Sequence, residues 1–171
     1  MSIINSMLSG FLNKVNFLIK PTSRVLLCFF FFCQAYGMDK ITRKKILDDI
    51  RPSISHLAGQ SIKFKINVLN ENRGWVLLVG ELRSASSDSI DWRKAKDCDE
   101  NLDKMLWVVA KSVSGSWVIE DMAICAPEPP FWYLEPKMAF SRPCEIYAGL
   151  EDGTEKTIEN QCKEYKKSNS R

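Results

Sequence analysis

The N-terminal segment most constrains what this chain can fold into, because residues 1–37 have the pattern of a secretory signal. They carry three basic residues and no acidic one, and an apolar run follows over residues 25–33. That run is too short for a membrane anchor, which needs roughly 20 apolar residues. Ala35 and Gly37 place small residues at the third and first positions before a cut, the pattern that signal peptidase recognises. The sequence therefore predicts a cleavable signal peptide ending near Gly37.

Cleavage changes the charge of the chain. The segment holds three of the 24 basic residues and none of the 21 acidic ones, so the mature form is neutral. A neutral domain has no excess positive charge for nucleic acid or for an anionic membrane surface. We therefore expect no nucleic-acid partner and a mature form, periplasmic or secreted, that is not embedded in a membrane.

Four of the six cysteines remain after cleavage: Cys98, Cys125, Cys144 and Cys162. An even number in an exported chain indicates two disulfides, for which the sequence leaves three pairings open. A zinc site would need closely spaced ligands, whereas these cysteines are 27, 19 and 18 residues apart and His56 is the only histidine. We expect disulfide bonds, with buried free thiols as the alternative, and neither a metal nor another cofactor.

Residues 40–57 have the period of an amphipathic helix. The apolar side chains that fall near one face are Ile46, Leu47, Ile50, Ile54 and Leu57. Pro52 is expected to kink this helix or to open a second short one, because proline removes a backbone donor. Gly59 is a typical helix stop.

From residue 61 the apolar period changes to two, which is typical of half-buried strands. The side chains that share one side of the first strand are Ile62, Phe64, Ile66 and Val68. A turn at residues 70–74 leads into a continuous apolar run at residues 75–82, a strand expected to be buried on both faces. Beyond a long polar loop at residues 83–103, a second hairpin is expected from strands over residues 102–111 and 117–126.

One helix followed by two hairpins predicts an α+β fold. In this fold the N-terminal helix packs on a curved four-stranded antiparallel sheet, and disulfides staple the domain. Removing 37 of 171 residues leaves 134, a length that suits one domain with one core. We place that domain at residues 38–150. Residues 151–171 are expected to form a polar C-terminal tail that Cys162 ties down.

Several motifs resemble those of a family of small uncharacterised bacterial exported proteins. The motifs are Arg51-Pro52, Gly74-Trp75-Val76, Ile90-Asp91-Trp92, Gly115-Ser116-Trp117, Ala123-Ile124 and Trp132. The resemblance covers residues 43–147 and implies a periplasmic or extracellular setting and a cystatin-like or nuclear-transport-factor-like curl of the sheet. Where the family has a Gly-Pro-Thr-Asp type of turn, this chain has Cys125 to Glu128, so no role for the family's turn aspartate is transferred. The resemblance implies no activity.

Few residues form a pattern that indicates catalysis. Histidine is a common general base, but His56 stands at a helix end with no nucleophile motif beside it. Acidic residues are numerous in the polar loop and include Asp91, Asp97, Asp99, Glu100 and Asp103. They are numerous enough for a carboxylate pair or a calcium site, yet they lack the EF-hand glycine and closing glutamate. We expect them to be solvated, and the catalytic residues stay unassigned.

Four aromatic side chains are the candidate binding residues: Trp92, Phe131, Trp132 and Tyr133. Exposed tryptophan and tyrosine anchor partner proteins and sugars, whereas buried ones would close the open end of the sheet. The expected function is an exported small binding domain of unknown ligand, for example an envelope immunity or inhibitor protein that captures another protein. The alternative is a small hydrolase or isomerase that uses a cavity in the curved sheet, with acidic residues near Asp91 as acid or base. A structural envelope component is a third hypothesis.

Overall fold

A computed structural model describes residues 38–86, 89–96, 98–99, 104–128 and 130–170. The expected signal peptide and its cleavage point lie outside the described residues, as do Asp97, Glu100 and Asp103 of the polar loop. From Met38 to Arg171 the chain forms one compact unit.

Helix α3 (Lys40–Ala58) is the expected amphipathic helix. Its first turn is capped by Asp39, whose carboxylate accepts hydrogen bonds from two backbone amides at 2.9 Å. Its buried residues are spaced by four: Ile46, Ile50, Ile54 and Ala58. The helix runs through Pro52 as a single element and does not open a second short helix, because this apolar stripe is buried on both sides of the proline. Gly59 ends it in the left-handed conformation, with φ 65°.

The sheet consists of β1 (Ile62–Asn72), β2 (Trp75–Ser84), β3 (Met105–Val113) and β4 (Ser116–Ala126), antiparallel and in consecutive order. Each hairpin closes through two residues with positive φ. These are Arg73 (51°) and Gly74 (74°) in the first and Ser114 (51°) and Gly115 (82°) in the second. Such turns match the natural twist of paired strands. The predicted α+β fold, one helix on a four-stranded antiparallel sheet, is confirmed.

One detail of β1 differs from the expected alternation. The register with β2 shifts between Ile66 and Val68, so one extra residue stands in β1. Ile62 and Ile66 therefore face α3, whereas Val68 packs on the opposite side of the sheet. The prediction that Val68 shares a side with Ile62 was wrong, because a bulge reverses the alternation of side chains beyond it.

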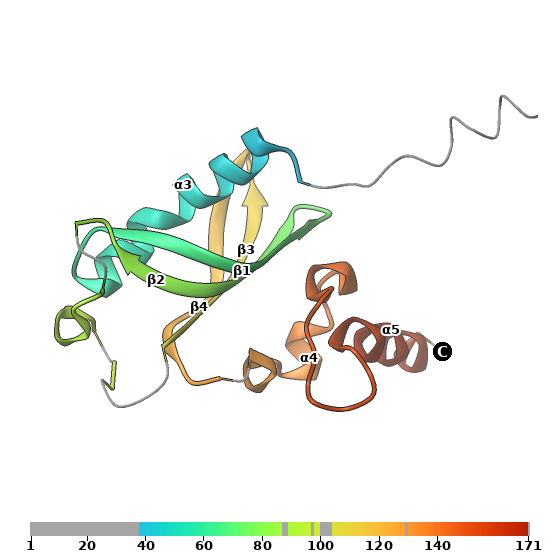
Figure 1. The fold of residues 1–171 in the computed structure, drawn as a ribbon. Coiled ribbons are helices and arrows are strands. Elements are labelled where there is room, and N and C mark those ends of the chain that lie inside the picture. Colours follow the sequence, from blue (N-terminus) through green and yellow to red (C-terminus); the bar gives the residue numbers. More distant parts are fainter. Residues whose placement is uncertain (1–37, 87–88, 97, 100–103, 129, 171) are drawn as a thin grey trace, which may run out of the picture. The chain divides into compact units, whose positions relative to one another are not determined.

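Both faces of the sheet are covered. The α3-side cluster joins α3 to Val76 and Leu78 of β2, and the C-terminal-side cluster joins Leu77 and Val79 of the same strand to Tyr147. Figure 1 shows α3 on one side of the sheet and the C-terminal helices on the other. The expected burial of β2 on both faces is thus confirmed, and a second helical layer causes it.

This second layer consists of η2 (Pro130–Tyr133), α4 (Pro136–Ala139), η3 (Cys144–Tyr147) and α5 (Ile158–Asn169). The Asn70 side chain of β1 holds η3 in place by donating to the carbonyls of Ile146 at 3.1 Å and Ala148 at 2.7 Å. Residues 151–171, described from sequence as a polar tail, contain α5. Ile158 and Cys162 are buried on one face of this helix, which makes the segment part of the core.

Two disulfides staple the domain, as expected. Cys98 pairs with Cys125 at a Cα–Cα distance of 5.6 Å, and Cys144 pairs with Cys162 at 5.5 Å. The first ties the loop after β2 to the end of β4 and is half-buried, whereas the second is buried and joins η3 to α5. The structure thereby selects one of the three pairings that the sequence left open.

Candidate binding surface

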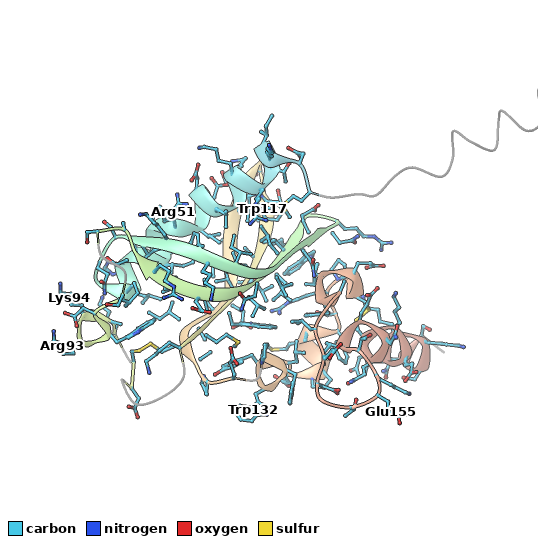
Figure 2. The ribbon with its side chains drawn as sticks, viewed as in Figure 1. Arg51, Arg93, Lys94, Trp117, Trp132 and Glu155 are labelled. Carbon is cyan, nitrogen blue, oxygen red and sulfur yellow. A yellow bond between two sulfur atoms is a disulfide. The ribbon has the colours of Figure 1, made fainter. Side chains whose placement is uncertain are left out.

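Helix η2 carries three of the four predicted binding residues. Phe131 and Tyr133 are half-buried against the C-terminal-side cluster, where the Tyr133 ring stacks on Trp107 with centroids 6.2 Å apart. Trp132 lies between them and is 63% exposed, and Figure 2 shows it projecting away from the ribbon. It contacts Phe131 edge to face at 6.2 Å. Because both neighbours are anchored in the core, the exposed indole stands on a well-packed support.

The surroundings of Trp132 along the chain are acidic. Glu128 and Glu135 are exposed on either side of η2, and residues 112–136 contain no lysine or arginine. Burial raises the pKa of Tyr133 above its ordinary value, so its hydroxyl stays neutral at physiological pH. Along the chain, the exposed Trp132 therefore lies between two exposed glutamates, and the exposed Lys137 follows the second of them.

Trp92, the fourth predicted binding residue, lies elsewhere. It begins the short helix η1 (Trp92–Lys94), is half-buried and packs against the α3-side cluster. The ammonium of Lys104 lies 5.9 Å from its ring centroid. Since the α3-side and C-terminal-side clusters occupy opposite faces of the sheet, the structure does not bring Trp92 together with the aromatic residues of η2.

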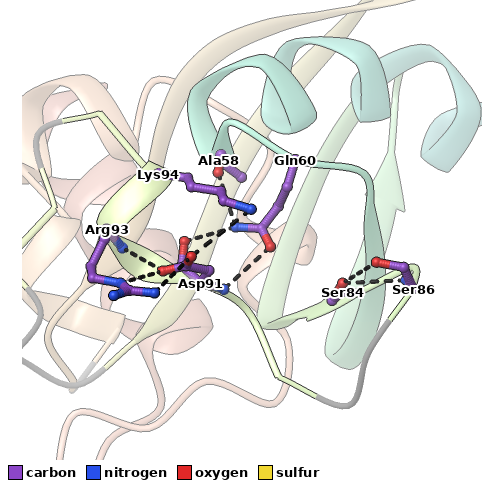
Figure 3. A network of polar contacts seen from close by, with 7 residues as sticks. All are labelled: Ala58, Gln60, Ser84, Ser86, Asp91, Arg93 and Lys94. Atoms are coloured by element: carbon purple, nitrogen blue, oxygen red, sulfur yellow. Dashed lines mark hydrogen bonds and ion pairs between the residues drawn. The ribbon is translucent and has the colours of Figure 1, made fainter.

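Asp91 caps η1 and belongs to the polar network of Figure 3. Its carboxylate accepts hydrogen bonds from Arg93 Nε at 2.9 Å and Nη2 at 3.1 Å. Gln60 joins its own loop to this one by donating to the Asp91 carbonyl at 2.9 Å and accepting from its amide at 3.2 Å. The hydrogen bonds from Arg93 hold the pKa of Asp91 below its usual value. Asp91 is therefore a stable anion that organises the loop.

Other predicted candidates for chemistry are scattered. His56 is exposed near the end of α3, and its Nε2 lies 3.2 Å from the Lys96 ammonium. Among the described residues, no three histidine, cysteine or carboxylate side chains gather closely enough to hold a metal ion.

A cationic and aromatic cluster not found from the sequence lies on the sheet face that carries the C-terminal layer. Trp75 has the Lys111 ammonium 5.0 Å and the Arg142 guanidinium 5.6 Å from its ring centroid. Lys111 stands opposite Trp75 in the β2–β3 register, which hairpin geometry could have indicated. Arg142 approaches from the segment between α4 and η3, and no local pattern in the sequence marks that approach.

Within the part of the chain that the structure describes, no helix is both long and apolar enough to cross a bilayer. No protein-family model, curated protein or solved structure matches this chain.

Proposed function

We propose that this protein is an exported binding domain that captures another protein through the surface centred on Trp132. The observation that carries the proposal is the 63% exposure of this indole between two neighbours packed into the core. Tryptophan is enriched among the residues that dominate binding energy at interfaces. A side chain held on rigid support also loses little conformational entropy on binding.

The charges beside Trp132 indicate the partner's chemistry. Glu128 and Glu135 are exposed, and no basic residue occurs between positions 112 and 136. Complementary charge guides association and selects partners. A partner that presents basic groups around an apolar pocket fits this surface best.

Export to the bacterial periplasm or exterior is part of the proposal. Two disulfides are typical of proteins that fold in an oxidising compartment, and the signal pattern and the family resemblance support the same setting. An immunity or inhibitor protein that covers a toxin or hydrolase in the envelope is one concrete form of such a domain.

The alternative enzyme hypothesis receives less support. A hydrolase or isomerase would use a cavity in the curved sheet, but β2 and β3 bury side chains on both faces against the two helical layers. A general acid near neutral pH needs a raised pKa, whereas Arg93 lowers the pKa of Asp91. No observation favours the enzyme, and we do not propose it.

Affinity capture from an envelope extract tests the binding proposal. The wild-type oxidised protein is expected to retain a stoichiometric partner, and Trp132→Ala is expected to weaken that complex by about tenfold or more. The same variant should change the free energy of unfolding by less than about 0.5 kcal/mol, because the side chain is mostly exposed.

Ile41→Ala is the matched control, since Ile41 is 82% exposed on α3, which covers the other face of the sheet. It is expected to leave capture unchanged. Equal loss of partner in both variants, or full retention by Trp132→Ala, would contradict a contact surface centred on Trp132.

A further inference from the structure

Arg142 is a buried cation without a carboxylate partner. The Arg142 side chain is largely buried, and the residue as a whole is only 8% exposed. A largely buried guanidinium normally has an opposite charge nearby. Among the described residues, no aspartate or glutamate oxygen lies within 4.0 Å of it. The contact seen for its guanidinium is with the face of Trp75, whose ring centroid lies 5.6 Å away.

The charges around Arg142 are mainly positive. Lys111 lies over the same Trp75 ring, and Lys166 of α5 donates to the Arg142 carbonyl at 2.6 Å. Asp121 is the opposing charge: it acts on the Tyr147 hydroxyl together with Arg142 but forms no ion pair with it in the described part of the chain. Lys111 and Lys166 therefore add positive charge near Arg142, and Asp121 partly offsets it.

The guanidinium is largely buried but keeps some contact with solvent. Among the described side chains, the buried nitrogen and oxygen atoms with no hydrogen-bond partner are Asn72 Oδ1 and Trp107 Nε1, and no nitrogen of Arg142 is among them. The Arg142 guanidinium nitrogens, for which no hydrogen bond is seen among the described residues, therefore keep some contact with solvent. A planar guanidinium with free N–H groups matches the paired oxygens of a carboxylate or a phosphate.

We propose that Arg142, supported by Trp75 and Lys111, binds a small oxyanion, either a carboxylate or a phosphate. This site is separate from the proposed contact surface at Trp132 and does not depend on it. Trp75 supports the guanidinium, and the ammonium of Lys111 adds attraction at longer range. The neighbouring charge of Asp121 limits the affinity, so we expect a dissociation constant on the order of 1–10 mM.

NMR titration of the isotope-labelled oxidised protein tests this proposal. Sodium phosphate and sodium acetate are added separately to about 100 mM, roughly ten times the weakest constant expected, with sodium chloride keeping the ionic strength constant. Saturable shifts of the Trp75 indole N–H and the Arg142 side-chain N–H are expected. Saturation by both anions assigns a general oxyanion site, and saturation by one of them assigns the carboxylate or the phosphate as its ligand.

Two variants and one control separate specific binding from general charge effects. Arg142→Lys keeps the positive charge but loses the planar guanidinium with its paired N–H donors, so it should bind the anion about tenfold more weakly. Lys111→Met changes an exposed side chain, so it should fold normally and bind about threefold more weakly. Lys137→Met removes an exposed cation of α4 and should change nothing. Shifts that stay linear, that spread evenly over exposed lysines, or that saturate in Arg142→Lys at the same anion concentration as in the wild type would overturn the proposal.

Discussion

The two disulfides offer a test of what stabilises the C-terminal layer. Replacing both cysteines of a pair by alanine gives two variants, C98A/C125A and C144A/C162A, which open loops of 27 and 18 residues respectively. Loop-closure entropy alone predicts costs of about 3.5 and about 3.2 kcal/mol. By this measure the Cys98–Cys125 bond should contribute slightly more to stability.

Burial reverses that order. Cys144 and Cys162 are 4% and 0% exposed within the C-terminal-side cluster, whereas Cys98 and Cys125 are only half-buried. Removing two buried sulfur atoms adds about 1 kcal/mol each for lost packing. We therefore expect C144A/C162A to lose about 5 kcal/mol and C98A/C125A about 3.5 kcal/mol.

Urea unfolding of the oxidised proteins, followed by circular dichroism, measures both free energies. A loss of about 5 kcal/mol is a large part of the stability of a small domain, so amide exchange in α5 (Ile158–Asn169) supplies a second readout. Its amides should lose protection in C144A/C162A and keep it in C98A/C125A. An equal or larger loss of stability in C98A/C125A, with α5 protected in both, would refute the argument from burial.

Two further predictions concern the link between α3 and its neighbours. Gly59→Ala should destabilise the domain by about 2–3 kcal/mol in thermal or urea unfolding. Gly59 has φ 65°, and an added Cβ would lie 2.3 Å from the Lys94 carbonyl oxygen. Unchanged stability would contradict this close approach. Asp49 accepts a hydrogen bond from the Trp117 backbone amide, which lowers the pKa of its carboxyl group. The ionised carboxylate therefore stabilises the folded domain above pH 4, and this contribution is lost as the pH falls through the lowered pKa. Asp49→Asn should therefore reduce the loss of stability below pH 4, and an unaltered acid profile would show that this carboxylate does not contribute.

Local periodicity was sufficient to predict most of the secondary structure. Isoleucines spaced by four marked α3, and the Asn70–Gly74 region and Gly115 marked the two hairpins because tight turns need residues that tolerate positive φ. Val68 shows the limit of this reasoning. A bulge is a property of strand pairing, so the alternation in one strand contains no sign of the extra residue.

The candidate surface was predicted in part. The aromatic run after the last strand identified Phe131, Trp132 and Tyr133, but it did not show that only the middle one is exposed. That depends on Trp107, which provides the ring on which Tyr133 stacks. Arg142 was missed because its partner Trp75 lies in another hairpin, and contacts of this kind follow from packing alone.

The sequence by itself determined the elements whose causes are local: the amphipathic helix, the four strands and the presence of two disulfides. Only the tertiary structure decided which cysteines pair, that the polar segment past residue 150 closes the second face of the sheet, and that Trp132 is left outside the core. The physical reason is range. Side-chain period and turn chemistry act over a few residues, whereas burial and charge pairing depend on groups that meet only after the chain has folded.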